Sequence, residues 1–181
     1  MMGQRVLVFG ISGVGKTQTC TDYADRHPDT LFVSASSLLT AATAQSGESL
    51  RTASPDEIRN NQAKLASALA DFCAGREALP VLIDAHGVID NDSEFVRIPV
   101  SAIESLSPHR LILLEAAPAV VAERRAADAR PRPQRPIDAI AREIAAERDA
   151  VKSYARALDL DLAIAEVVPG FRLDTLLDGP G

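Results

Sequence analysis

The chain has 181 residues, of which 46% are hydrophobic and 24% charged, and its formal net charge is −6 at pH 7. This length favours a single domain over residues 1–181, because domains hold about 150 residues on average. The composition is that of a globular protein and excludes disordered, collagenous and disulfide-rich classes. No apolar run approaches the roughly 20 residues that cross a bilayer, and the N-terminus lacks the pattern of a secretory signal. We therefore expect a cytoplasmic protein with no membrane partner.

The charge is unevenly distributed along the chain. Between Glu123 and Arg135, five arginines accompany two acidic residues, which gives this segment a local charge of +3. Net negative charge argues against a nucleic-acid duplex as the partner, because neutralising its phosphates needs a surplus of Lys and Arg. One compact basic segment in an acidic protein favours a small polyanion such as a nucleotide.

Short apolar runs alternate with helical stretches along the chain. The predicted strands cover residues 5–9, 31–34, 80–84, 110–114 and 162–168. The predicted helices cover residues 15–26, 54–73, a stretch after residue 118, 137–158 and 171–177. Such alternation predicts an α/β fold, with a five-stranded parallel sheet covered by helices on both faces.

A phosphate loop follows the first predicted strand. Residues 10–17 read GISGVGKT and match the G-x-x-x-x-G-K-[ST] pattern at a strand-to-helix junction. Its glycines let successive N–H groups turn inward, and the helix N-terminus adds partial positive charge, so the loop forms an anion cradle. Lys16 is then expected to reach the β- and γ-phosphates of ATP, and the Thr17 hydroxyl to ligate Mg²⁺. We assign nucleotide binding to Gly13, Val14, Gly15, Lys16, Thr17 and Gln18, together with Arg124.

Asp84 ends the predicted strand 80–84, and His86 follows it. The carboxyl ends of parallel strands face the ligand crevice, so Asp84 is a second candidate ligand of Mg²⁺. For His86, contact with substrate and a structural hydrogen bond are both open. Residue 85 is alanine, so no glutamate stands there to activate water, and no N-K-x-D motif is present. These two observations weaken the motor and GTPase alternatives.

The arginine-rich segment 124–136 is a candidate lid. Within it, residues 130–136 (RPRPQRP) must form a loop, because proline removes N–H donors and disfavours helix in the residue before it. Phosphoryl transfer spreads negative charge over the moving group, and arginines that close over it stabilise that charge and exclude water. We therefore predict catalytic roles for Arg124, Arg130 and Arg132 beside Lys16. A solvated run of charges is the alternative.

The polar segment 34–54 lies between the second strand and a helix that begins with a Ser54–Glu57 capping box. We interpret this segment as one side of an acceptor site. Arg51 is its only basic residue.

Taken together, these motifs resemble the archaeal-type adenylate kinases and the related nuclear adenylate kinase and ribosome-assembly ATPases. The loop GISGVGKT is similar to theirs, with Ser12 in place of the usual proline, and PVLIDAHG resembles their strand ending in Asp-x-His. The pair Arg130 and Arg132 resembles the arginines of their lid. The resemblance implies a P-loop NTPase fold with a short lid and Mg²⁺-dependent, reversible transfer of the ATP γ-phosphoryl group to AMP or a similar nucleoside monophosphate. It also implies an acceptor side that includes Ser36, Arg51 and His86.

Two alternatives stay open. The first is a P-loop kinase with another small-molecule or nucleoside acceptor. The second is an ATP-dependent assembly or regulatory module, in which nucleotide binding would switch a surface that contacts a protein partner. Against the module, the predicted helices bury their apolar faces and leave no exposed apolar stripe.

Overall fold

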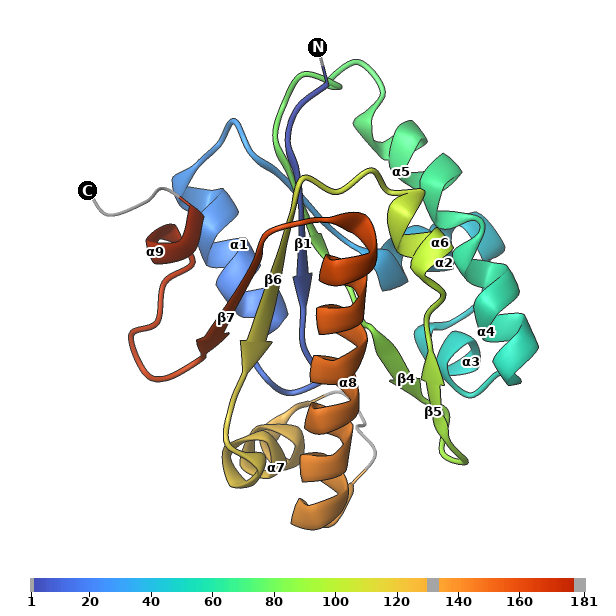
Figure 1. Cartoon of the computed structure of the whole chain (residues 1–181), viewed down its shortest axis with the longest axis vertical. Helices are drawn as coiled ribbons and strands as arrows, with labels where there is room; N and C mark the ends of the chain where they lie inside the picture. Colours follow the sequence, from blue (N-terminus) through green and yellow to red (C-terminus); the bar gives the residue numbers. More distant parts are fainter. Residues whose placement is uncertain (1, 130–133, 178–181) are drawn as a thin grey trace.

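A five-stranded parallel sheet forms the centre of the molecule (Figure 1). The computed structural model describes residues 2–129 and 134–177. The strand order is β2-β3-β1-β6-β7, and every pair is parallel, which confirms the predicted sheet. The strands are β1 (Arg5–Phe9), β2 (Leu31–Ser34), β3 (Val81–Asp84), β6 (Arg110–Glu115) and β7 (Leu162–Glu166).

Helices cover both faces of this sheet (Figure 1). One face packs against α2, α5, α6 and α8, and the other against α1, α7 and α9. The helices are α1 (Lys16–Arg26), α2 (Ala35–Thr43), α3 (Gly47–Arg51), α4 (Pro55–Gln62), α5 (Leu65–Cys73), α6 (Val100–Glu104), α7 (Pro118–Ala127), α8 (Ile137–Leu158) and α9 (Asp174–Leu177). Within the described ranges, no helix is long and apolar enough to cross a membrane.

Alternate residues of the central strand supply the two cores. Leu7 and Phe9 of β1 pack on the α8 side, whereas Val6 and Val8 pack on the α1 side. The Phe9 ring lies against that of Tyr154 in α8, with ring centroids 5.9 Å apart. A strand buried on both faces reads as a continuous apolar run, which is why the sequence indicates it clearly.

Several features differ from the sequence-based prediction, among them the short helix α6, which was not expected. The single helix expected over residues 54–73 is two helices, α4 and α5, because i→i−3 hydrogen bonds at Ala63 and Lys64 tighten the chain between them. A second, antiparallel sheet of β4 (Val88–Asp90) and β5 (Phe95–Arg97) was not expected. The segment expected to be a polar connection contains α2 and α3, whose N-termini are capped by Ser34 and Ser46.

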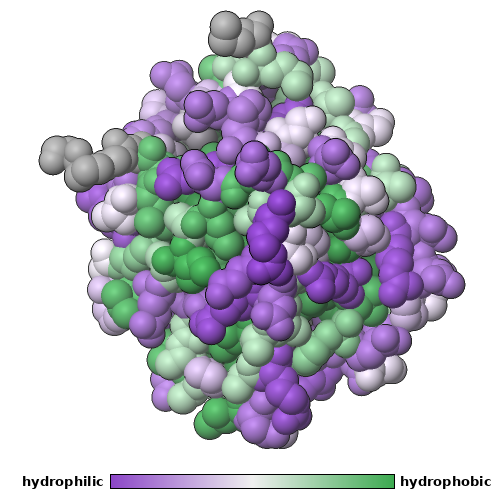
Figure 2. Space-filling model, viewed as in Figure 1, coloured by the Kyte–Doolittle hydropathy of each residue, from purple (hydrophilic) through white to green (hydrophobic). Residues whose placement is uncertain are grey.

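The sheet is least covered along β7, its edge strand. On the face shown in Figure 2, hydrophobic surface gathers over the region of β6 and β7 among otherwise mostly polar residues. Ile164 is 43% exposed and Val168 is 50% exposed. These exposed apolar residues belong to the edge strand β7 and the chain that follows it, not to a helix face.

Candidate active site

The phosphate loop connects β1 to α1 as predicted. Gly13 and Gly15 have φ angles of +89° and +102°, a region that favours glycine. A Cβ atom at Gly13 would also lie 2.9 Å from Cγ of Arg125, which is closer than side-chain atoms pack. The Lys16 side chain is 5% exposed and donates to the carbonyl oxygen of Gly10 over 2.6 Å, so it folds back along the loop.

Asp84 lies beside this loop, at the carboxyl end of β3. Its Oδ2 accepts from the Thr17 hydroxyl over 2.8 Å, and its Oδ1 lies 3.3 Å from Lys16 Nζ. Burial opposes ionisation, but the positive charge of Lys16 and the neighbouring His86 outweigh it, so the pKa of Asp84 lies below its ordinary value. The carboxylate is therefore negative and faces the anion cradle.

The oxygens of Thr17 and Asp84 fit the requirements of Mg²⁺. This cation prefers oxygen ligands, and it is commonly held by one or two protein groups together with water and substrate phosphates. Within residues 2–129 and 134–177, no cluster of three or more His, Cys, Asp or Glu side chains is arranged to hold a metal. Two protein ligands, the Thr17 hydroxyl and the Asp84 carboxylate, suit a Mg²⁺ ion that binds together with a nucleotide.

Two arginines of α7 hold the phosphate loop from outside. Arg124 Nη1 donates to the carbonyl oxygen of Val14 over 2.7 Å. Arg125 Nε donates to the carbonyl oxygen of Ser12 over 2.8 Å, and its Nη2 contacts both carboxylate oxygens of Glu143. The Arg125 and Glu143 side chains are only 4% and 9% exposed, so this is a buried ion pair. The loop is fixed by the helix that leads into the arginine-rich segment.

A buried carboxylate that the sequence analysis did not single out lies behind the loop. Glu147 of α8 is 1% exposed and accepts hydrogen bonds from the backbone amides of Gly10, Gly87 and Val88. Burial raises the pKa of Glu147 despite these hydrogen bonds. Its position seven residues after Ile140 puts a charged residue on the apolar stripe of the helix, and this is the signal that would have revealed it.

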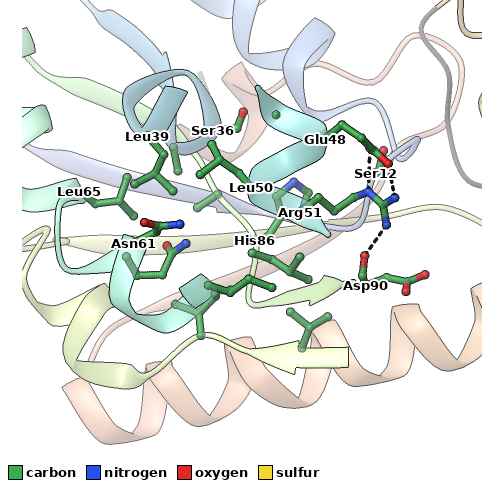
Figure 3. A pocket seen from close by; sticks show the side chains of 18 of the residues that line it. Ser12, Ser36, Leu39, Glu48, Leu50, Arg51, Asn61, Leu65, His86 and Asp90 are labelled. Carbon is green, nitrogen blue, oxygen red and sulfur yellow. Dashed lines mark hydrogen bonds and ion pairs between the residues drawn. The ribbon is translucent and has the colours of Figure 1, made fainter. Parts of the chain in front are cut away.

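A cavity of about 400 Å³ opens next to the phosphate loop. Ser12 lines it at the loop, and the predicted acceptor-side residues Ser36, Arg51 and His86 also line it. Figure 3 shows Arg51 at one end of this cavity beside Glu48 and Asp90. The three acceptor-side candidates therefore line one cavity, and this cavity extends to the phosphate loop.

Arg51 is held by acidic groups at the rim of the cavity. It pairs with Glu48 at 2.7 Å and with Asp92 at 2.8 Å, and it donates to the carbonyl oxygen of Asp90. Arg135 pairs with the carboxylates of Asp90 and Asp92 from the other side. The turn between β4 and β5 thus connects Arg51 on the acceptor side to Arg135, which belongs to the predicted lid segment 124–136.

The remaining site candidates divide into three groups. Val14 is buried beneath the loop, and the Gln18 amide donates to Asp22 on the exposed side of α1. Arg124 contacts the loop, as given above. Arg130 and Arg132 lie outside the described residues, so their roles stay predictions.

The parallel sheet, the phosphate loop and the strand-end aspartate define a P-loop protein with the kinase type of fold. A family described as an AAA domain matches residues 9–142, and the chain belongs to that family.

Comparison with solved structures supports the fold. The chain is similar to shikimate kinase from Bacteroides thetaiotaomicron, with a TM-score of 0.56 and 16% identity over 88% of this chain and 85% of that one. It is also similar to a gluconokinase from Sinorhizobium meliloti, with a TM-score of 0.50 and 16% identity over 92% of this chain and 83% of that one. At this identity the likeness concerns the fold alone. No curated protein sequence matches the chain.

Proposed function

We propose that this chain transfers the γ-phosphoryl group of ATP to a nucleoside monophosphate, with AMP as the first acceptor to test. The observation that carries the proposal is the cavity of about 400 Å³ that reaches from Ser12 of the phosphate loop to Arg51. Its volume falls in the range of about 300–1,000 Å³ that is usual for small-molecule sites. An acceptor in this cavity would present one end to the anion cradle, where the γ-phosphate of ATP is expected.

In the proposed reaction, an oxygen of the acceptor phosphate bonds to the γ-phosphorus while the bond to the β–γ bridging oxygen breaks, which leaves ADP. Lys16 and Arg124 would stabilise charge on the phosphates, with Arg130 and Arg132 closing over them. Thr17 and Asp84 would hold Mg²⁺, which when bound neutralises phosphate charge. No general base is needed, because a monophosphate is already an anion at neutral pH, and catalysis consists mainly of positioning.

A second candidate acceptor is a small hydroxylated molecule. One observation favours it: among the described residues, the two arginines that line the cavity are already paired with carboxylates, Arg51 with Glu48 and Asp92, and Arg125 with Glu143. An acceptor phosphate would have to replace Glu48 or Asp92 as a partner of Arg51. Both of these carboxylates are more than 40% exposed, so exchange costs little.

The test is ADP formation from Mg²⁺-ATP with a panel of nucleoside monophosphates, nucleosides and small hydroxy acids. We expect ADP to form with at least one monophosphate, and Lys16→Ala to abolish that transfer. Lys152→Ala is the matched control, because Lys152 is exposed on α8, far from the loop in sequence. ADP formation only with a hydroxylated acceptor would support the second candidate. ATP hydrolysis that needs a protein partner and no acceptor would instead indicate an assembly or regulatory ATPase.

A further inference from the structure

Gln62, the last residue of α4, is a buried amide without a protein partner. It is 7% exposed, and within the described ranges its side chain makes no hydrogen bond. Among those residues, the only side-chain nitrogen or oxygen that is both sealed from solvent and unpartnered is Arg110 Nε. The amide of Gln62 therefore reaches free volume, and Gln62 lines the cavity described above.

The amide of Gln62 is not sealed from solvent, so its donor and its acceptor face the open cavity and are available to a molecule that enters it. Buried polar groups are otherwise almost always paired. The free amide of Gln62 thus indicates a hydrogen-bonding partner that enters the cavity from outside.

The surroundings of Gln62 show what kind of partner fits. Leu39, Ile58 and Leu65 line the same cavity and are each at most 5% exposed. Asn61 also lines the cavity, and its side chain likewise makes no hydrogen bond to a described residue. In Figure 3, Asn61 and Leu65 lie at one end of the cavity and Arg51 with Glu48 lies at the other.

The cavity therefore has two chemically different ends. One end is charged and approaches the phosphate loop, and the other is apolar with two primary amides. A nucleobase has flat apolar faces and an edge that carries a hydrogen-bond donor beside an acceptor, and a primary amide pairs with such an edge through both of its polar atoms. A polyhydroxylated acid has polar groups on every side, and apolar walls would leave several of them unpaired.

We infer that Gln62, assisted by Asn61, hydrogen-bonds the base edge of a nucleoside monophosphate that occupies this cavity. The inference rests on the proposed function and deepens it, because it assigns the base to the α4 end of the cavity. Gln62 then distinguishes a nucleotide from a bare sugar phosphate.

The test is equilibrium binding, by calorimetry, of AMP, GMP, CMP, UMP and ribose 5-phosphate to the full chain. We expect at least one monophosphate to bind about tenfold or more tighter than ribose 5-phosphate, since losing a buried hydrogen-bonded group weakens binding by at least that factor. Gln62→Leu should reduce this preference to about threefold or less. Asn60→Leu, an exposed neighbour on the same helix that does not line the cavity, should retain it.

Three results would overturn the inference: no monophosphate binds, ribose 5-phosphate binds as tightly as each of them, or Gln62→Leu keeps the preference. Gln62→Met serves as a second variant if Gln62→Leu does not fold, and the comparison of ligands on the unmodified chain needs no variant. The proposed transfer is judged separately, by ADP formation. A chain that forms ADP with a monophosphate but keeps its preference over ribose 5-phosphate in Gln62→Leu would refute the base-reading role of Gln62 alone. A chain that binds no monophosphate and transfers phosphate only to a hydroxy acid would refute both proposals.

Discussion

Both oxygens of the Glu147 carboxylate accept a hydrogen bond from the backbone amide of Gly87, each over 2.9 Å. The same carboxylate accepts from the amide of Gly10, where the phosphate loop begins. Tyr154, two turns further along α8, donates to the carbonyl oxygen of Gly87. Helix α8 therefore fixes the position of the phosphate loop relative to the turn after β3.

Removing this carboxylate should destabilise the fold strongly. Glu147→Ala leaves three buried amides, those of Gly10, Gly87 and Val88, without an acceptor, and each such loss costs about 1–3 kcal/mol. We predict that the free energy of unfolding in urea falls by at least about 3 kcal/mol, and by less in Glu147→Gln, which keeps one acceptor oxygen. Glu104→Ala, at an exposed position of α6, is the control. If Glu147→Ala were as stable as this control, the role of Glu147 as a stabilising hydrogen-bond acceptor would be refuted.

Arg125→Ala should also act on stability. It leaves Glu143 buried without its partner, and breaking a buried ion pair in this way costs about 3–5 kcal/mol. Urea denaturation measures the loss, and Arg142→Ala, which breaks an exposed ion pair in α8, should cost less than about 1 kcal/mol. If Arg125→Ala and Arg142→Ala lowered the free energy of unfolding equally, the proposed stabilising role of the buried Arg125–Glu143 ion pair would be contradicted.

The other arginines should act on the rate of transfer. Arg124→Ala, Arg130→Ala and Arg132→Ala are each expected to lower kcat by at least about tenfold, as for other groups that stabilise charge in the transition state. Steady-state ADP formation with the best acceptor of the panel measures this, with Arg142→Ala as the control. If Arg130→Ala and Arg132→Ala both turn over normally, segment 124–136 is not a catalytic lid.

Stability in acid should depend on Asp92. Hydrogen bonds from Arg51 and Arg135 lower the pKa of Asp92 from 3.8 to about 2. A carboxyl whose pKa is lower in the folded state stabilises the fold above its ordinary pKa and loses that contribution as the pH falls through the folded value. The stability difference between the wild type and Asp92→Asn should therefore be larger at about pH 5 than at about pH 3, measured by urea unfolding. If the stability difference between the wild type and Asp92→Asn increased as the pH fell, the prediction would be contradicted.

The main sheet could be predicted from the sequence because its buried strands are continuous apolar runs. The pair β4 and β5 could not, since each strand has three residues and Phe95 is exposed. The break between α4 and α5 was missed for a different reason. Ala63 and Lys64 are good helix formers and give no sign of the break, although Asn60 and Asn61 just before them favour helix less.

Much of the candidate site follows from the rule that ligands bind at the carboxyl ends of parallel strands. That rule brings Asp84 to Thr17 without any knowledge of side-chain positions. Glu147 and Gln62 were missed because periodicity shows which face of a helix is buried and not what that face contacts. A carboxylate on the apolar stripe of α8 was the available signal for Glu147, whereas Gln62 had none, since one glutamine at a helix end is usually solvated.

The central claim is that the cavity beside the phosphate loop holds the acceptor, and filling it tests this most directly. Ser36 lines the cavity, whereas Thr40, on the same helix, is exposed and does not. We predict that Ser36→Trp binds ATP as the wild type does but loses acceptor-dependent ADP formation by at least about tenfold, and that Thr40→Trp retains both. Unchanged acceptor-dependent turnover in Ser36→Trp would contradict the account.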